Sequence, residues 1–173
     1  MKIFVIAGHA GSGKSEVAKI ISDYYNNNDT KCIISEFSKY LKVYAHEIVG
    51  WNYIDEKPRD FLQSMGSYIR SINPKFLINR MIEDIKIYAD FADALVISDT
   101  RLSEEVKAIK DKFSDVVTIY VKNEFATSKL SLEQQQDITE TALDDSDLFD
   151  YTIINTDLDL LKSDVKNIIK ENE

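Results

Sequence analysis

The chain has 173 residues, a net charge of −9 at pH 7 and 44% apolar residues. This length predicts a single domain, and this apolar fraction predicts a buried core rather than a disordered chain. The acidic balance disfavours nucleic acid and membrane surfaces as general partners, because both repel an acidic protein. Since Cys32 is the one cysteine, no intrachain disulfide can form, which favours a cytoplasmic protein. No apolar run is long enough for a signal peptide or a membrane helix.

Strand-like and helix-like patterns alternate along the sequence. In chain order they predict a strand at 2–7, a helix from Lys14, a strand at 31–36, helices across most of 37–88, a strand at 94–98, a helix at 104–113, strands at 116–121 and 151–154, and a helix at 158–169. The alternation predicts an α/β fold in three layers, with a five-stranded parallel sheet covered by helices on both faces. In such sheets, ligands bind at the carboxyl ends of the strands.

The first predicted strand is followed directly by GHAGSGKS, residues 8–15, which has the spacing Gly-x-x-x-x-Gly-Lys-Ser of a phosphate-binding loop. Its glycines let backbone N–H groups approach a polyphosphate, and the start of the next helix adds partial positive charge. The spacing places Lys14 at the β- and γ-phosphates and the Ser15 hydroxyl on Mg²⁺. The predicted phosphate-binding residues are Gly8, Gly11, Ser12, Gly13, Lys14, Ser15 and Glu16. This phosphate loop predicts a nucleoside triphosphate with Mg²⁺ and leaves the reaction open.

A second polar group, in the sequence DTR, follows the third predicted strand. Alternation along an extended chain puts Asp99 and Arg101 on the same side, at the carboxyl edge of the sheet. A carboxylate at this place suits Mg²⁺, its water shell or an acceptor group, and a guanidinium suits phosphate. The alternative is an ion pair in a surface loop.

The stretch KPRDFLQSMGSYIR, residues 57–70, predicts a helix with an unusual polar face. Arg59, Gln63, Gly66 and Arg70 fall within about 60° of one another on such a helix. A glycine inside a helix costs roughly 1 kcal/mol against alanine, which indicates close packing or a close ligand. Of the four arginines in the chain, three lie in this stretch and in DTR. In an acidic protein this concentration favours an anion site over solvated helix cations.

These stretches together resemble the P-loop nucleoside monophosphate kinases, and most closely the phage-type deoxynucleoside monophosphate kinases. The resemblance rests on GHAGSGKS, on FSKYLKVYAHEIVGW followed by KPRDFLQSMGSYIR, on SDTRLSEE, and on DITETALDD before a last strand ending in IIN. It implies ATP-dependent transfer of the γ-phosphoryl group to a nucleoside or deoxynucleoside monophosphate, with Mg²⁺ as cofactor. It also implies one P-loop kinase domain over 1–173, with an acceptor-binding helical segment at 37–90 and a lid-like segment at 122–147. A homodimer is compatible with it.

The resemblance also implies a role for each matched residue. These roles are catalysis for Lys14, Asp99 and Arg101, metal binding for Ser15 and Asp99, acceptor binding for Arg59, Gln63 and Arg70, and adenine binding for Asn155 and Thr156.

The chain departs from the resemblance in the lid, where such kinases carry arginines that close over the transferred group. Residues 122–150 contain Lys122 and Lys129 but no arginine. Because phosphoryl transfer requires positive charge around the equatorial oxygens, either Lys129 substitutes, or Arg101 and Lys14 suffice, or transfer is slow. The alternatives are a kinase for another phosphorylated acceptor, such as phosphomevalonate, and a nucleotide-binding regulatory module. A GTPase is disfavoured, because the sequence has no Asn-Lys-x-Asp guanine signature.

Overall fold

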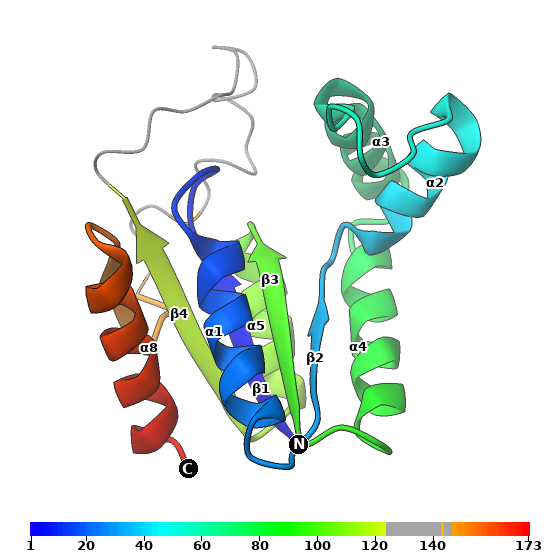
Figure 1. The fold of residues 1–173 in the computed structure, drawn as a ribbon. Coiled ribbons are helices and arrows are strands. Elements are labelled where there is room, and N and C mark those ends of the chain that lie inside the picture. The colour runs from blue at the N-terminus through cyan, green and yellow to red at the C-terminus, as the bar shows by residue number, and fades with distance from the viewer. Residues whose placement is uncertain (124–142, 144–146) are drawn as a thin grey trace.

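A five-stranded parallel sheet forms the centre of the molecule (Figure 1). The structure, a computed structural model, describes residues 1–123, 143 and 147–173. The strands are β1 Lys2–Ala7, β2 Cys32–Ser35, β3 Ala94–Thr100, β4 Val116–Lys122 and β5 Tyr151–Ile154. Their order across the sheet is β2-β3-β1-β4-β5, so the strand that precedes the phosphate loop lies in the middle. All pairings are parallel, and every strand therefore ends at the same edge.

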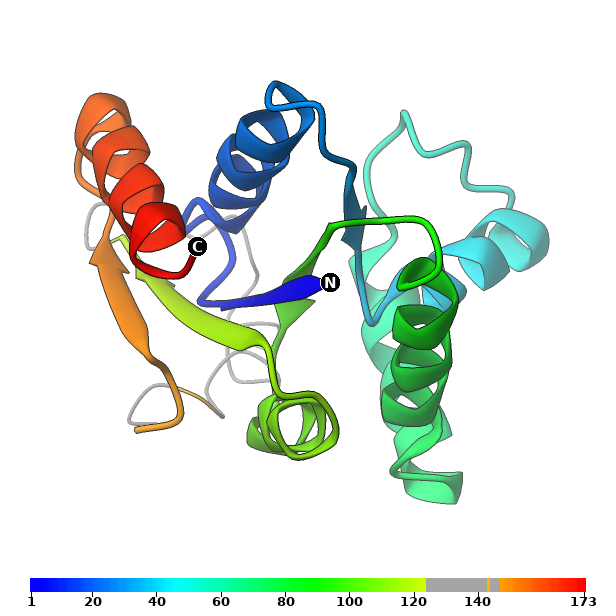
Figure 2. The same ribbon diagram turned by 90° about the horizontal axis from the view of Figure 1, so that it is seen from below.

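Helices cover both faces of this sheet. The described helices are α1 Lys14–Asn26, α2 Lys39–Val49, α3 Arg59–Ile72, α4 Phe76–Tyr88, α5 Ser103–Lys112 and α8 Leu158–Glu171, and of these α1, α4, α5 and α8 pack on the sheet. Side chains alternate along β1, so Phe4 and Ile6 pack under α1 and α8, whereas Ile3 and Val5 pack under α4 and α5. Seen along the sheet, α1 and α8 lie on one side and α5 on the other (Figure 2). The result is the predicted three-layer α/β fold.

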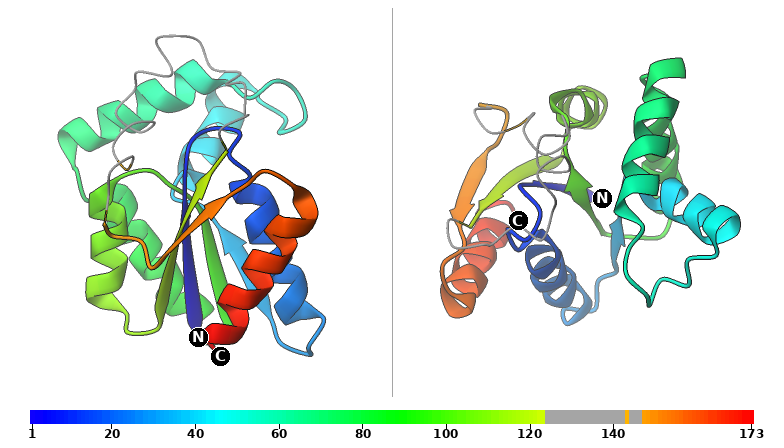
Figure 3. Two further views of the ribbon diagram at one scale, coloured as in Figure 1. Left: turned by 90° about the vertical axis from the view of Figure 1, so that its left-hand side faces the viewer. Right: turned by 90° about the horizontal axis from the view of Figure 1, so that it is seen from above.

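Helices α2 and α3 lie beyond the carboxyl edge of the sheet, on the side of β2 (Figures 1 and 3). They have a small apolar core of their own, in which Leu41 and Ala45 from α2 pack against Leu62 from α3 and Leu77 from α4. This packing holds the two helices above the strand ends, where ligands bind in parallel sheets.

The five strands and the helices predicted in the described part of the chain are confirmed, with boundaries shifted by a few residues. The predicted acceptor-binding segment 37–90 contains α2, α3 and α4. The predicted lid-like segment 122–147, including Lys129, lies largely outside the described residues. Among the described helices, none is both long enough and apolar enough to cross a membrane.

Candidate functional site

The phosphate loop runs from the end of β1 to the start of α1 with an irregular backbone. Gly8 and Gly13 have φ angles of +143° and +108°, which side chains of L-residues rarely allow. A Cβ at Gly8 would overlap the carbonyl oxygen of Val121, and a Cβ at Gly13 would overlap the side-chain amide of Asn155. Glycine is therefore required at both positions, by conformation and by space.

Lys14, the first residue of α1, lies over this loop. Its Nζ donates hydrogen bonds to the carbonyl oxygens of Gly8, at 2.6 Å, and of His9, at 2.7 Å. The pKa of Lys14 is lowered to about 8, first by burial and then by the positive charges of Arg101 and Lys57, while the charge of Asp99 opposes the decrease. Its ammonium group therefore lies near two other cations, both from distant parts of the chain.

The residue after β5 fastens the phosphate loop from the other side. Asn155 donates its Nδ2 hydrogen bond to the carbonyl oxygen of Ser12, at 2.9 Å, and its backbone N–H to Lys122 O, at 2.7 Å. The side chain of Asn155 thus shapes the loop directly. Thr156 follows it on the surface. A contact of either residue with adenine stays a prediction.

A pocket lies between the carboxyl edge of the sheet and the underside of α2 and α3, and we call it the α3 pocket. Its volume is about 110 Å³. Arg59, Gln63 and Arg70, predicted from one helix face, all line it. Asp99 and Arg101 line it from the end of β3. Two motifs that are far apart in the sequence therefore form one site, as the anion-site hypothesis requires.

In the α3 pocket the carboxylates have partners within the chain, whereas two of the cations form no ion pair with the described residues. Its cations are Lys57, Arg59, Arg70 and Arg101, and its carboxylates are Glu36, Asp99 and Glu105. Each carboxylate already has a partner within the chain: an ion pair with Lys42 for Glu36, and backbone N–H donors for the other two. Within the described residues, neither Lys57 nor Arg59 forms an ion pair. The pocket is therefore suited to an anionic ligand.

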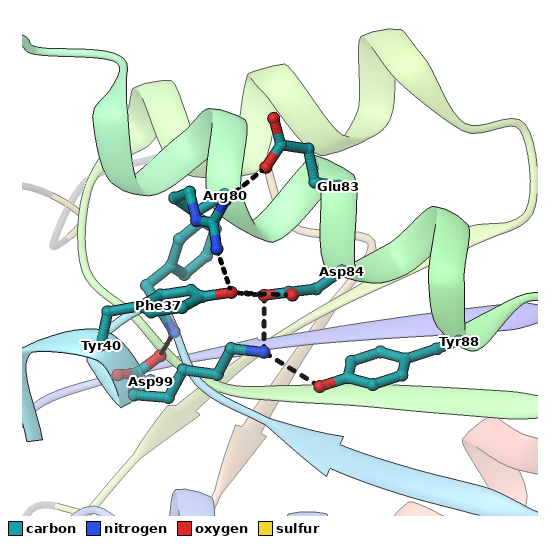
Figure 4. Close-up of polar contacts among 8 residues, drawn as sticks. Phe37, Tyr40, Arg80, Glu83, Asp84, Tyr88 and Asp99 are labelled. Atoms are coloured by element: carbon teal, nitrogen blue, oxygen red, sulfur yellow. Dashed lines mark hydrogen bonds and ion pairs between the residues drawn. The ribbon is translucent and has the colours of Figure 1, made fainter. Parts of the chain in front are cut away.

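Asp99 fastens the start of the 37–90 segment to β3. Its Oδ1 accepts the backbone N–H of Phe37 at 2.7 Å (Figure 4). Its Oδ2 accepts that of Ser38 at 3.0 Å. Both amides lie in the connection between β2 and α2. These contacts give Asp99 a positioning role that the sequence did not indicate. Its catalytic and metal-binding roles stay predictions.

A second set of contacts ties α2 to α4 next to this point (Figure 4). The half-buried Lys39 ammonium forms an ion pair with the buried Asp84 at 2.6 Å and donates to the Tyr88 hydroxyl at 2.9 Å. Tyr40 donates its hydroxyl hydrogen to Asp84 at 2.9 Å, and Arg80 donates to the Tyr40 oxygen at 3.2 Å. Of the four arginines, Arg80 is thus the one outside the pocket lining, and it serves the helix packing.

Glu105 is a buried carboxyl group at the edge of the α3 pocket. Its Oε2 accepts the backbone N–H groups of Arg101 and Leu102, at 2.9 and 3.1 Å. The pKa of Glu105 is raised to about 7, mainly by burial and also by the Asp99 charge, while the two backbone hydrogen bonds oppose the rise. These contacts cap the start of α5, and they place the Glu105 carboxyl group at the pocket, which the sequence analysis missed.

Gly66 explains how Arg70 reaches the pocket. A Cβ at Gly66 would lie 3.2 Å from Arg70 Nη1 and 3.3 Å from Leu41 Cδ1. The guanidinium of Arg70 folds back over the bare backbone of its own helix, and α2 packs closely beside it. The predicted packing reason for this helix glycine is confirmed.

Ser15 and Asp99 offer the oxygen ligands that Mg²⁺ prefers. The Ser15 hydroxyl is exposed in the first turn of α1, and the carboxylate of Asp99 lies close enough to Lys14 to raise its pKa. Mg²⁺ prefers oxygen ligands and keeps waters and substrate phosphates, so it needs few protein ligands. Ser15 and Asp99 would hold it.

Lys57, Glu36 and Glu105 line the pocket and were missed as site residues. Lys57 opens the KPRDF stretch directly before Pro58 and Arg59, and this position was the one available signal. Glu36 and Glu105 carry no local signal, because charged residues beside strands and in first helical turns are common on surfaces.

Comparisons with known proteins identify the fold. No family model and no curated protein sequence matches the chain. Solved structures do match over nearly the whole length. The APS kinase CysC of Mycobacterium tuberculosis, in complex with AMPPNP and APS, has a TM-score of 0.60 and 13% identity over 98% of this chain and 97% of that chain.

Two further kinases give similar values. A sugar kinase from Janibacter sp. HTCC2649 has a TM-score of 0.54 and 12% identity, covering 98% of this chain and 95% of that chain. Shikimate kinase from Bacteroides thetaiotaomicron has a TM-score of 0.50 and 11% identity, covering 98% and 97%. At these identities the likeness is one of fold. The chain therefore has the α/β fold of the P-loop kinases, with its phosphate loop after the central strand.

Proposed function

We propose that the protein transfers the γ-phosphoryl group of ATP to a nucleoside or deoxynucleoside monophosphate, giving the diphosphate and ADP. The observation that carries this proposal is the α3 pocket, in which four cations surround a space beside Lys14 while each pocket carboxylate is bonded within the chain. Such a site suits a second anion next to the ATP phosphates. The shared fold with kinases that act on small molecules supports phosphoryl transfer.

In this proposal the two substrates meet at the carboxyl edge of the sheet. The phosphate loop and Lys14 bind the ATP phosphates, and Arg59, Gln63 and Arg70 bind the acceptor. Ser15 and Asp99 would hold Mg²⁺, which would supply positive charge against the polyphosphate. Arg101 is close to both groups, because it lines the pocket and its charge lowers the pKa of Lys14.

The chemistry then requires positioning and charge rather than a base. An oxygen of the acceptor phosphate, already anionic, forms the new bond to the γ-phosphorus. The bond between this phosphorus and the β,γ-bridging oxygen breaks, and its electron pair leaves with ADP. Cations around the equatorial oxygens and correct alignment supply the acceleration.

The test is ADP formation from ATP and Mg²⁺ across a panel of ribo- and deoxynucleoside monophosphates, with phosphomevalonate and a no-acceptor control. We expect stimulation by one or a few nucleotides. Lys14→Ala should abolish it, whereas Lys19→Ala, which removes an exposed lysine from the same helix, should leave it intact. Tight ATP binding without stimulation by any acceptor would favour the regulatory module instead.

A second candidate is transfer to an alcohol of an anionic small molecule. It is favoured by Glu105, whose carboxyl group lines the pocket with a pKa raised to about 7, suitable for accepting a hydroxyl proton. APS, the ligand named with one of the similar kinases, belongs in the panel for this reason. Turnover that requires a hydroxyl acceptor and is lost in Glu105→Gln would favour this candidate.

A further inference from the structure

The sequence between β4 and β5 leaves a question of charge. Phosphoryl transfer develops negative charge on the equatorial oxygens of the transferred group, and kinases surround that group with cations. Residues 122–150 of this chain contain no arginine. In a kinase with this sequence, a cation from another element would compensate for the missing arginines.

Lys57 has the position and the electrostatic surroundings for this role. It lies in the connection between α2 and α3, two residues before the start of α3, and its half-buried side chain lines the α3 pocket. No side chain in the described part of the chain forms an ion pair with it. A cation removed from water without a partner is costly, which indicates that a ligand anion completes the site.

Four charged side chains lie near Lys57 and affect its pKa. Burial lowers the pKa of Lys57, and the neighbouring charges of Lys42 and Arg101 add to the effect, while Glu36 and Asp99 oppose it. Glu36 is already paired with Lys42, and both oxygens of Asp99 accept backbone N–H groups. Both nearby carboxylates are therefore bonded to other groups, and neither forms an ion pair with Lys57.

The same electrostatics distinguish Lys57 from the cations of α3. Of the four pocket cations, Lys57 and Arg101 are the two whose charges lower the pKa of Lys14. Lys14 is the residue that the phosphate loop places at the β- and γ-phosphates. Thr100 at the end of β3 pairs with Ala7 beside the phosphate loop, so Asp99 and Arg101 connect that loop to the pocket that Lys57 lines, whereas Arg59 and Arg70 belong to α3.

We propose that Lys57 is a catalytic residue that donates hydrogen bonds to the transferred phosphoryl group from the acceptor side of the site. The proposal rests on the proposed phosphotransferase function. As the bond from the acceptor oxygen to the γ-phosphorus forms and the bond to the β,γ-bridging oxygen breaks, Lys57 keeps its protons and stabilises the charge on the equatorial oxygens. Together with Lys14 and Arg101 it supplies the positive charge for which the 122–150 segment has no arginine.

The experiment compares Lys57→Gln, Lys57→Arg and Lys75→Gln with the unaltered protein. Lys75 is an exposed lysine just before α4 and serves as a matched control for the loss of one positive charge. Steady-state kinetics use ATP, Mg²⁺ and the panel acceptor that gives the highest turnover. Thermal unfolding and AMP-PNP binding are measured on every variant to confirm that each one folds and binds nucleotide.

We expect Lys57→Gln to lower kcat about 100-fold, because removal of one donor to a developing oxyanion has effects of this order. Both KM values should change less than about threefold, since Lys57 acts on charge that develops in the transition state. Lys57→Arg should recover at least about tenfold of the loss, because it keeps the charge. Lys75→Gln should match the unaltered protein.

Three results would overturn the inference. An unchanged kcat in Lys57→Gln would remove the catalytic role. A higher acceptor KM with an unchanged kcat would assign Lys57 to the acceptor's own phosphate. If the unaltered protein turns over no acceptor, the proposed function fails and the inference fails with it, which the kinetics of the unaltered protein reveal before any variant is compared.

Discussion

Asp99→Asn tests whether the connection between β2 and α2 is fastened to β3 as the structure describes. The Asp99 carboxylate accepts the N–H groups of Phe37 and Ser38 at 2.7 and 3.0 Å. An asparagine has one carbonyl oxygen, so one bond is lost and its NH₂ group faces a backbone donor. Because hydrogen bonds to a charged group are worth about 1.5–3 kcal/mol each, the exchange should cost about 2–4 kcal/mol.

Hydrogen exchange of the Phe37 and Ser38 amides measures directly how much free energy the lost hydrogen bonds contribute. A loss of about 2 kcal/mol corresponds to roughly 30-fold faster exchange of the Phe37 and Ser38 amides, while amides in the middle of β1 should be unaffected unless the whole domain is destabilised. Asp93→Asn is the matched control. Asp93 accepts one backbone N–H, from Lys31 at 2.8 Å, at the opposite edge of the sheet, so its loss should leave the Phe37 and Ser38 amides unchanged.

The same variant has an electrostatic consequence at the phosphate loop. The Asp99 charge raises the pKa of Lys14, which lies at about 8, so its removal should lower that pKa further. Less of Lys14 is then protonated at pH 8, and polyphosphate binding should weaken as the pH rises through this range. Unchanged exchange at Phe37 and Ser38 in Asp99→Asn would refute the anchoring role, whatever happens to activity.

Three further predictions concern the pocket and the loop. Arg70→Ala should raise the acceptor KM about 10- to 100-fold, the value of one charged hydrogen bond, and leave the ATP KM nearly unchanged; equal effects on both would show that the acceptor site is misplaced. Asn155→Ala should weaken inorganic tripolyphosphate binding about fivefold through the lost bond to Ser12, and a loss confined to ATP would indicate an adenine contact instead. Because the pKa of Glu105 is raised from 4.5 to about 7 on folding, the folded state binds more protons between these values, so stability falls as the pH rises through them. Glu105→Gln should remove this decline, up to about 3 kcal/mol, and identical pH dependence of urea unfolding in both proteins would contradict the assignment.

The phosphate loop and the sheet were predictable because their signals are local. Each strand is a short apolar run, and GHAGSGKS combines glycines, lysine and serine at a spacing that follows from one strand-to-helix turn. The polar face of α3 was likewise predictable, since helical periodicity alone brings Arg59, Gln63 and Arg70 to one side. That all three reach one pocket depends on Gly66, over which Arg70 folds back.

The partners of Asp99 and Asn155 were decided only by the tertiary structure. Asp99 is 62 residues from Phe37, and Asn155 is 143 residues from Ser12, so no spacing rule connects them. Their contacts arise because parallel strands end at one edge and bring their following loops together. A carboxylate after a strand predicts a polar site in general, but whether it meets a metal, a ligand or a backbone amide depends on which loop packs beside it.

The sequence by itself therefore determined the α/β fold, the phosphate loop and the two cation-bearing motifs, because periodicity and spacing act over a few residues. The tertiary structure decided which charges are satisfied. It pairs Glu36 with Lys42, buries Glu105 against backbone amides, and leaves Lys57 half-buried in the pocket near Lys14. Burial and charge balance are properties of side chains from several elements together, and for this reason no stretch of the sequence contains them.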